Sequence, residues 1–247
     1  MSTKDIITSI NRNDGNMFLD IVSSLSLEDL KIVDFNQVDD ALLNNIKFPL
    51  KEKLAYAKYY NRPIYSKLVK SIIDDPYSSD YDGVLFLARV EESVRYKLLD
   101  ILVIRTSSLI QADSFMFQLK MSNLLDDYIQ YLKNGIDTRA KVQFALYFGY
   151  LDDFYPDHYQ LAQMIVKTNG YRGLISARTD ALVKLASLTN DKMTLEYING
   201  IIEELVKLEA EEYYNETYGS MGIDVSQKEK DKHIKKKLGY ILKRLKK

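Results

Sequence analysis

The chain of 247 residues contains no cysteine, no tryptophan and only two histidines, His158 and His233. Without cysteine there is no disulfide framework, no thiolate metal site and no cysteine nucleophile. Two distant histidines also leave no material for a catalytic triad, and no Walker loop, Gly-x-Gly-x-x-Gly or Gly-x-Ser-x-Gly motif occurs. We therefore expect no catalytic residues, no cofactor and a protein that is not an enzyme.

Long hydrophobic runs are missing as well. The most apolar stretch, Val84 to Ile104, contains six charged residues, whereas a membrane span needs roughly 18 or more apolar residues in succession. The first eleven residues place charged and polar side chains where a signal peptide has an apolar centre. These features predict a soluble, intracellular protein in the cytoplasm.

Ten glycines and four prolines are few for this length, which argues against a turn-rich β fold. Apolar residues recur at helical spacing, and Ser2 with Asp5 and Ser26 with Asp29 have the spacing of capping boxes. We predict an all-α fold of ten to thirteen helices. Because similar segments recur without a constant period, an irregular, solenoid-like stack of helical hairpins and a compact multi-helix bundle are both compatible with the pattern.

The polar loop 74–83 is the best candidate for a boundary between parts of the chain. It separates an N-terminal helical region, residues 1–75, from a main helical region, residues 84–217. A basic amphipathic C-terminal helix follows at residues 226–247, and the three regions also fit one continuous domain. Within the main region, the pair Glu91-Glu92 leaves open whether residues 84–104 form one helix or two.

The charge of the chain is strongly polarised. Residues 228–247 hold ten basic and two acidic residues, a net charge of +8, whereas residues 1–227 hold 24 basic and 33 acidic residues, a net charge of −9. The basic segment also has a helical apolar seam, formed by Ile234, Leu238, Ile241, Leu242 and Leu245. A basic helix with an apolar seam can contact nucleic acid, an anionic membrane, a groove of a partner protein or an acidic surface of its own chain.

Nucleic acid and an anionic membrane would be bound by different features of this segment. Its lysines and arginine can neutralise phosphates, which gives an affinity that falls steeply with salt. Membrane binding would depend on charge, because Tyr240 is the only aromatic residue available as an interfacial anchor.

A third interpretation needs no ligand. Residues 203–216 hold six glutamates against Lys207, so the basic helix has an acidic helix on which to fold back. Ile234, Leu238 and Leu245 would then close the seam left by Ile202, Leu205 and Leu208. This hairpin is favoured over any single ligand, and it still permits lysines to face outward.

Residues 51–70 form a second basic zone, with six basic residues against Glu52. Tyr56, Tyr59, Tyr60 and Tyr65 are interleaved with the cations, as in proteins that hold single-stranded nucleic acid by phosphate contacts and base stacking. Tyrosines at helical spacing also pack commonly into cores with their hydroxyls at the rim.

Two acidic clusters contain side chains of the kinds that ligate metal ions. The loop around Asp80 and Asp82 resembles the centre of an EF-hand loop, but its first position is Ser78 and its twelfth is Arg89, so both end ligands are missing. The group around Pro156 holds Asp152, Asp153, Asp157 and His158 without a recognisable metal motif. We expect turns and helix caps at both places and no metal site.

These features predict a non-enzymatic helical binding protein, with nucleic acid as the leading ligand. The alternative is a protein–protein interaction module or inhibitor that uses its acidic helical body, and the residue bias also fits a viral or phage regulator. The predicted nucleic-acid-binding residues are Lys235, Lys236, Lys237, Lys243, Arg244, Lys246 and Lys247 in the tail, with Lys51, Lys58 and Arg62 in the second zone.

Overall fold

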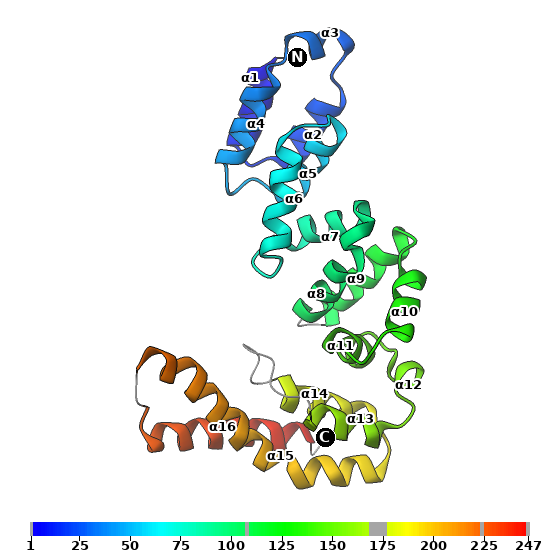
Figure 1. Ribbon diagram of the computed structural model, residues 1–247, viewed down its shortest axis with the longest axis vertical. Coiled ribbons are helices and arrows are strands. Elements are labelled where there is room, and N and C mark those ends of the chain that lie inside the picture. The colour runs from blue at the N-terminus through cyan, green and yellow to red at the C-terminus, as the bar shows by residue number, and fades with distance from the viewer. Residues whose placement is uncertain (1, 107–108, 168–176, 223–224, 246–247) are drawn as a thin grey trace. The chain divides into compact units, whose positions relative to one another are not determined.

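The computed structural model describes residues 2–106, 109–167, 177–222 and 225–245, and within these ranges it contains sixteen α-helices and no strand. The predicted all-α fold is confirmed, with more and shorter helices than expected. The chain divides into two compact units, a first unit of residues 1–140 and a second unit of residues 141–247 (Figure 1). No helix within the described ranges is both long enough and apolar enough to cross a membrane.

The first unit contains ten helices and the start of an eleventh. In chain order these are α1 (Thr3–Asn11), α2 (Gly15–Ser23), α3 (Leu27–Ile32), α4 (Phe35–Asn44), α5 (Leu50–Tyr59), α6 (Ile64–Asp74), α7 (Tyr81–Val90), α8 (Arg95–Arg105), α9 (Leu109–Met121), α10 (Leu125–Asn134) and α11 (Arg139–Tyr147). The short connections between them follow from local side-chain chemistry. Ser26 and Asp29 form the predicted capping box at the start of α3, and Asp80 caps α7 by accepting a hydrogen bond from the Gly83 amide at 3.0 Å.

The stretch 84–104 forms two helices. Glu91 leaves the helical region with φ −119° and ψ 100°, and one 3₁₀ turn, Glu92–Val94, leads into α8. The Glu91 carboxylate accepts hydrogen bonds from the Lys58 ammonium at 2.8 Å and the Tyr65 hydroxyl at 2.5 Å. Because these partners lie on α5 and α6, the break between α7 and α8 is held by tertiary contacts.

Aromatic residues form much of the core at the N-terminal end of the first unit. Phe18 makes edge-to-face contacts with Phe48 and Tyr56, at ring-centroid distances of 5.2 Å and 5.5 Å. Phe35 lies against Tyr56 and Tyr60 at 6.4 Å and 5.2 Å. Such contacts stabilise a core beyond the burial of their area, and they join α2, α4 and α5.

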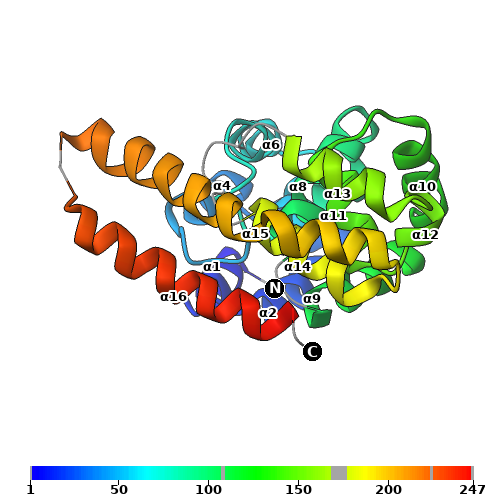
Figure 2. The same cartoon turned by 90° about the horizontal axis from the view of Figure 1, so that it is seen from below.

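The second unit is organised around the long helix α15. It continues from α11 through α12 (Leu151–Phe154), α13 (His158–Lys167), α14 (Ala177–Leu188), α15 (Lys192–Tyr213) and α16 (Gln227–Leu245), with a π-helical turn and a 3₁₀ turn over residues 214–221. Helices α13, α14 and α16 all pack against α15. Figure 2 shows α15 and α16 side by side as a helical hairpin.

The division at residues 140 and 141 lies inside the predicted main region, 84–217. The loop after α6 does not separate two cores, because α7, which follows the loop, packs on α5 as well as on α8. The basic C-terminal segment belongs to the second unit together with α15. Its side chains therefore have to be considered with those of α14 and α15.

Candidate nucleic-acid interface

The inner face of α16 is packed against its own chain. Ile241 is only 1% exposed, and Ile234, Leu238 and Leu245 pack on the apolar cluster that contains Ile202 and Leu205 of α15. The two helices are antiparallel, since Lys237 contacts Glu209 while His233, one turn earlier, contacts Tyr214, which follows α15. This is the arrangement that the hairpin interpretation describes. The exception is Leu208, which is 46% exposed and lies outside the seam.

Glu209, the residue after Leu208, lies in the seam instead of Leu208. Its side chain is fully buried and is held from two helices. At the first turn of α14, its carboxylate accepts hydrogen bonds from the Thr179 amide at 3.1 Å and from the Thr179 hydroxyl, and the Arg178 Nε lies 3.5 Å away. From α16, the Lys237 ammonium donates to Glu209 Oε2 at 3.0 Å.

These partners explain why a carboxylate is tolerated inside the second unit. A buried charge is costly unless it is paired and hydrogen-bonded. Thr179 lies in the first turn of α14, where backbone amides lack intrahelical acceptors and the helix dipole favours a negative charge. Lys237, one of the predicted nucleic-acid-binding residues, is thereby turned inward, and its side chain is only 18% exposed.

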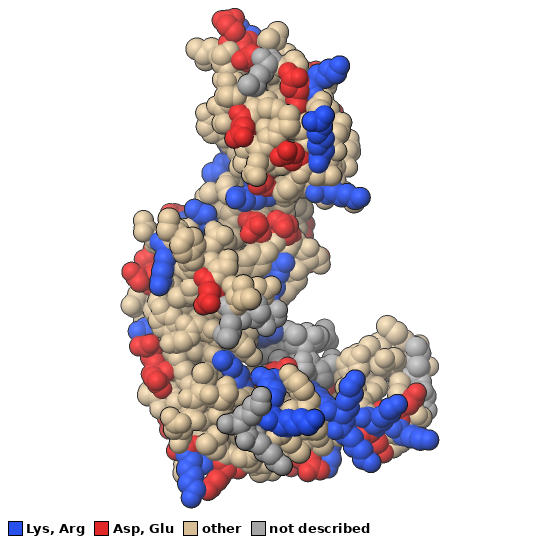
Figure 3. Space-filling model, turned by 180° about the vertical axis from the view of Figure 1, so that it is seen from behind, with Lys and Arg blue, Asp and Glu red and all other residues tan. Residues whose placement is uncertain are grey.

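The outer face of α16 carries most of its charge. Lys232, Lys236 and Lys243 are exposed, and at about 100° per residue they lie about 180° from the buried Ile234–Ile241 seam. Three further basic residues at the flanks of this stripe are also exposed: Lys228, Lys235 and Arg244. We call these six residues the α16 basic face. Figure 3 shows Lys and Arg side chains gathered along α16, at the lower right of the view.

The predicted tail residues are thus divided between two faces. Lys235, Lys236, Lys243 and Arg244 lie on the α16 basic face, whereas Lys237 lies in the hairpin. Within the described part of α16, the ion pair of Lys237 with Glu209 is the only one that its lysines and arginine form. Lys246 and Lys247 lie outside the described residues.

The second basic zone lies in the first unit, where its cations mostly have partners. Lys58 pairs with Glu91, and Lys51 is exposed on α5. Lys53 is buried and donates to the Asn45 carbonyl at 2.6 Å, and burial lowers the pKa of its ammonium group. This zone is therefore a weaker candidate surface than the α16 basic face.

Arg62 is placed in an internal site that we call the Asp39 site. Its Nε donates to the buried Asp39 carboxylate at 3.0 Å, and a terminal nitrogen donates to Asn36 at 2.9 Å. Its guanidinium also lies over the Phe35 ring, 5.3 Å from the centroid. The other Asp39 oxygen accepts from the Tyr56 hydroxyl at 3.0 Å, and burial, followed by the negative charge of Asp39, raises the pKa of Tyr56.

Replacing Arg62 with alanine should therefore act on stability. The change leaves Asp39, only 6% exposed, with neutral donors, and we expect the free energy of unfolding to fall by about 1–3 kcal/mol. Urea denaturation followed by circular dichroism measures this loss, with exposed Arg12→Ala as the control. A stable R62A variant that binds nucleic acid less tightly would contradict this structural role.

The interleaved tyrosines of the second zone do not form an exposed surface on which bases could stack. Tyr56 is buried, Tyr60 donates its hydroxyl to the Val22 carbonyl, and Tyr65 donates to Glu91. Tyr59 differs from these three, because its side chain is 77% exposed. Packing, with hydroxyls used inside the unit, accounts for most of the aromatic pattern.

The two acidic clusters serve as caps and turns. Asp75 accepts from the Ser78 amide, and Asp157 accepts from the Gln160 amide at the start of α13. His158 lies between Asp152 at 3.0 Å and the Thr189 hydroxyl at 2.8 Å. Among the described residues, no group of three or more His, Asp or Glu side chains is placed to hold a metal ion.

Two features of this interface were not predicted from the sequence. Lys228 and Lys232 belong to the basic face, and a helical projection around the predicted seam would have found both. Glu209 lies seven residues after Ile202, on the same stripe of α15, and this spacing was the available signal. Neither a family model nor a curated protein nor a solved structure matches the chain.

Proposed function

We propose that this chain is a non-enzymatic binding protein that contacts nucleic acid through the α16 basic face. The observation that carries the proposal is that one face of α16 is docked and its basic face is exposed. Docking uses the apolar seam and Lys237, and it leaves the six residues of the basic face exposed on the opposite side and its flanks. A helix that only completed a core would need few of these charges.

The geometry of the face suits a phosphate backbone. Lys232 and Lys243 are eleven residues apart, which corresponds to about 16 Å along the helix axis. That length covers roughly five base-pair steps of duplex DNA, at about 3.4 Å per step along one strand. Lysines act as point charges, so we expect contacts with phosphates and little reading of base sequence.

The test is a binding titration with labelled single- and double-stranded DNA and RNA at several salt concentrations. We expect K232Q/K236Q/K243Q to weaken binding and to make the slope of log affinity against log salt shallower. On duplex DNA the slope should change by about 0.9 for each phosphate contact that is lost, or roughly 2–3 for the triple variant.

A matched control removes the same number of charges elsewhere. Lys31, Lys192 and Lys207 are exposed, and each is paired with a glutamate on its own helix. The variant K31Q/K192Q/K207Q should retain the affinity and salt slope of the unmodified protein. Equal losses in the two triple variants would contradict a specific role for α16. Binding to anionic lipid vesicles without binding to any nucleic acid would overturn the proposal.

A further inference from the structure

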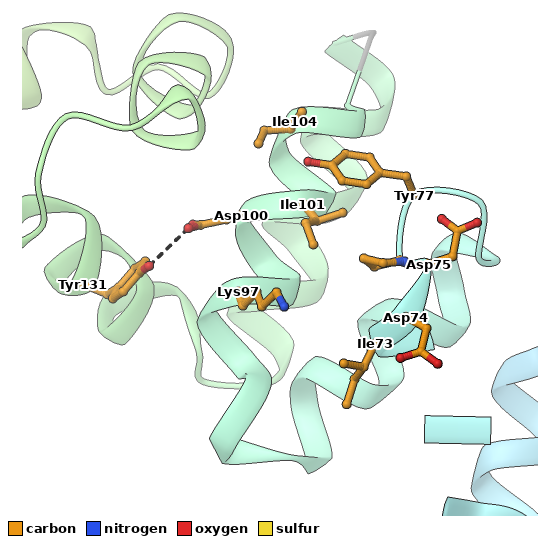
Figure 4. A pocket seen from close by; sticks show the side chains of 10 residues that line it. Ile73, Asp74, Asp75, Tyr77, Lys97, Asp100, Ile101, Ile104 and Tyr131 are labelled. Carbon is orange, nitrogen blue, oxygen red and sulfur yellow. Dashed lines mark hydrogen bonds between the residues drawn. The ribbon is translucent and has the colours of Figure 1, made fainter. Parts of the chain in front are cut away.

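The first unit contains an open cleft that the proposed function does not use. The cleft has a volume of about 580 Å³ and lies between the end of α6, the loop that follows it, α8 and α10 (Figure 4). Its apolar lining includes Ile73, Ile101 and Ile104, and its polar lining includes Lys97, Asp100 and Tyr131. Such a volume is within the range of about 300–1,000 Å³ that is typical of small-molecule sites.

The walls of the cleft are fixed by contacts within the unit. Arg105, at the end of α8, donates to the Pro76 carbonyl at 3.0 Å and lies 5.7 Å from the centroid of the Tyr81 ring. These contacts join the loop after α6 to α8. Tyr131 stacks on Tyr96 at a centroid distance of 4.4 Å with the rings only 5° from parallel, which joins α10 to α8.

Asp100 is the most unusual group in the cleft. One oxygen accepts from the Tyr128 hydroxyl at 2.8 Å and the other from the Tyr131 hydroxyl at 3.1 Å, and both donors are neutral. Burial raises the pKa of the Asp100 carboxyl, and the two hydrogen bonds act in the opposite direction. Lys97 lines the same cleft, but among the described residues Asp100 forms no ion pair.

The Asp39 site shows what is missing at Asp100. Both carboxylates accept a hydrogen bond from a buried tyrosine, Tyr56 in one site and Tyr128 in the other. At Asp39 the second oxygen meets the Arg62 guanidinium, which also lies over an aromatic ring. At Asp100 the second oxygen accepts from the Tyr131 hydroxyl instead, and both of these residues line the open cleft.

We propose that the cleft binds an alkylguanidinium group, such as an arginine side chain, with Asp100 as its anionic partner. A guanidinium is planar, donates hydrogen bonds to a carboxylate and stacks on aromatic rings, and the lining of the cleft offers the Asp100 carboxylate together with the Tyr77 ring. The aliphatic part of an arginine side chain would lie against the isoleucines of the cleft. Asp75, also in the lining, adds negative charge, whereas Asp74 is paired with Lys70 at 2.7 Å.

The isoleucines of the cleft provide a direct readout. Methyl NMR spectra of the full-length protein with labelled isoleucine would be recorded during titration with N-acetylarginine methylamide, a mimic of a peptide arginine. We expect saturable shifts at Ile73, Ile101 and Ile104 and unchanged signals from the distant core residues Ile6 and Ile10. The same titration with agmatine distinguishes a small free guanidine from an arginine within a peptide, and N-acetylcitrulline methylamide is the neutral control.

Two variants with opposite expected effects keep the test independent of folding. Asp100→Asn should weaken binding by at least about tenfold, because the charged partner is lost. Lys97→Gln should tighten binding by about two- to fivefold, because a nearby exposed cation is removed. Asp113→Asn, an exposed change on α9, is the charge-matched control and should have no effect.

The proposal is overturned if the citrulline compound binds as tightly as the arginine compound, or if K97Q fails to tighten binding. It is also overturned if methyl shifts are absent at millimolar ligand. Binding by the guanidinium compounds that is lost in D100N and strengthened in K97Q supports it. This outcome does not depend on the α16 basic face, since the cleft belongs to the first unit and its ligand is a cation.

Discussion

Replacing Ile241 with alanine is expected to lower the free energy of unfolding of the second unit by about 2–4 kcal/mol. Ile241 is the most deeply buried residue of α16, with 1% of its surface exposed, and it belongs to the core cluster that contains Ile202 and Leu205. The change removes three carbon atoms from a packed seam and leaves a cavity there. It therefore weakens the contact that holds α16 on α15.

Hydrogen–deuterium exchange can locate the loss. In Ile241→Ala, the amides of α16 should exchange faster, and those of α15 that face it should follow, while the first unit keeps its protection. Leu242→Ala is the matched control, because this neighbouring side chain, which was predicted to belong to the seam, is 43% exposed and lies outside it. An equal loss of protection in the two variants would show that α16 is not docked through this face.

The helical class and many helix starts could be predicted because they depend on local chemistry. The capping box at Ser26 and the cap at Asp157 both form as the sequence indicates. The helix α9 is not indicated by its sequence, for a physical reason. Its buried residues Phe115 and Leu119 are accompanied by Ile110 and Phe117, which are 83% and 64% exposed, so apolar residues lie on all sides and no stripe stands out.

The parts that could not be predicted depend on partners distant in sequence. Arg62 was assigned to a ligand surface because it lies among lysines, but its partner Asp39 is 23 residues away. Leu208 was assigned to the seam because it is apolar, and Glu209 was counted only among the glutamates of residues 203–216 that attract the basic helix. Only the arrangement of α14 against α15 supplies the Arg178 and Thr179 groups that make a buried Glu209 favourable.

The tail of the chain therefore combines two of the interpretations that its sequence allowed. Its seam and Lys237 complete the core of the second unit, and its outer lysines remain in solvent. A docked helix is a better phosphate-binding surface than a free arm, because its charges are held at fixed spacing and less entropy is lost on binding. We accordingly expect Ile241→Ala to weaken nucleic-acid binding less than K232Q/K236Q/K243Q does, since it removes no charge.

Replacing Glu209 with glutamine is expected to be still more damaging, with a loss of about 3–5 kcal/mol in the free energy of unfolding. Glutamine has nearly the same shape but no charge, so Lys237 would lose its anionic partner inside the hairpin. Arg178 would lose its contact with Glu209 and keep Glu212, which lies 2.6 Å away. The NH₂ group of glutamine would also place its hydrogens opposite one of the N–H or O–H groups from which Glu209 now accepts a hydrogen bond. Thermal denaturation should show a decrease of roughly 10 °C or more for this variant.

The relative losses in the free energy of unfolding of three variants test the role of Glu209 more sharply than the loss measured for one variant. Lys237→Met should cost less than Glu209→Gln, because Glu209 keeps Arg178 and Thr179 when the lysine is lost. Glu203→Gln, an exposed change on the same helix, should change stability by no more than about 0.5 kcal/mol. If K237M were as destabilising as E209Q, the ion pair between α15 and α16 would outweigh the contacts with α14. Glu209 would then act through Lys237 alone, rather than as the anion shared by three helices.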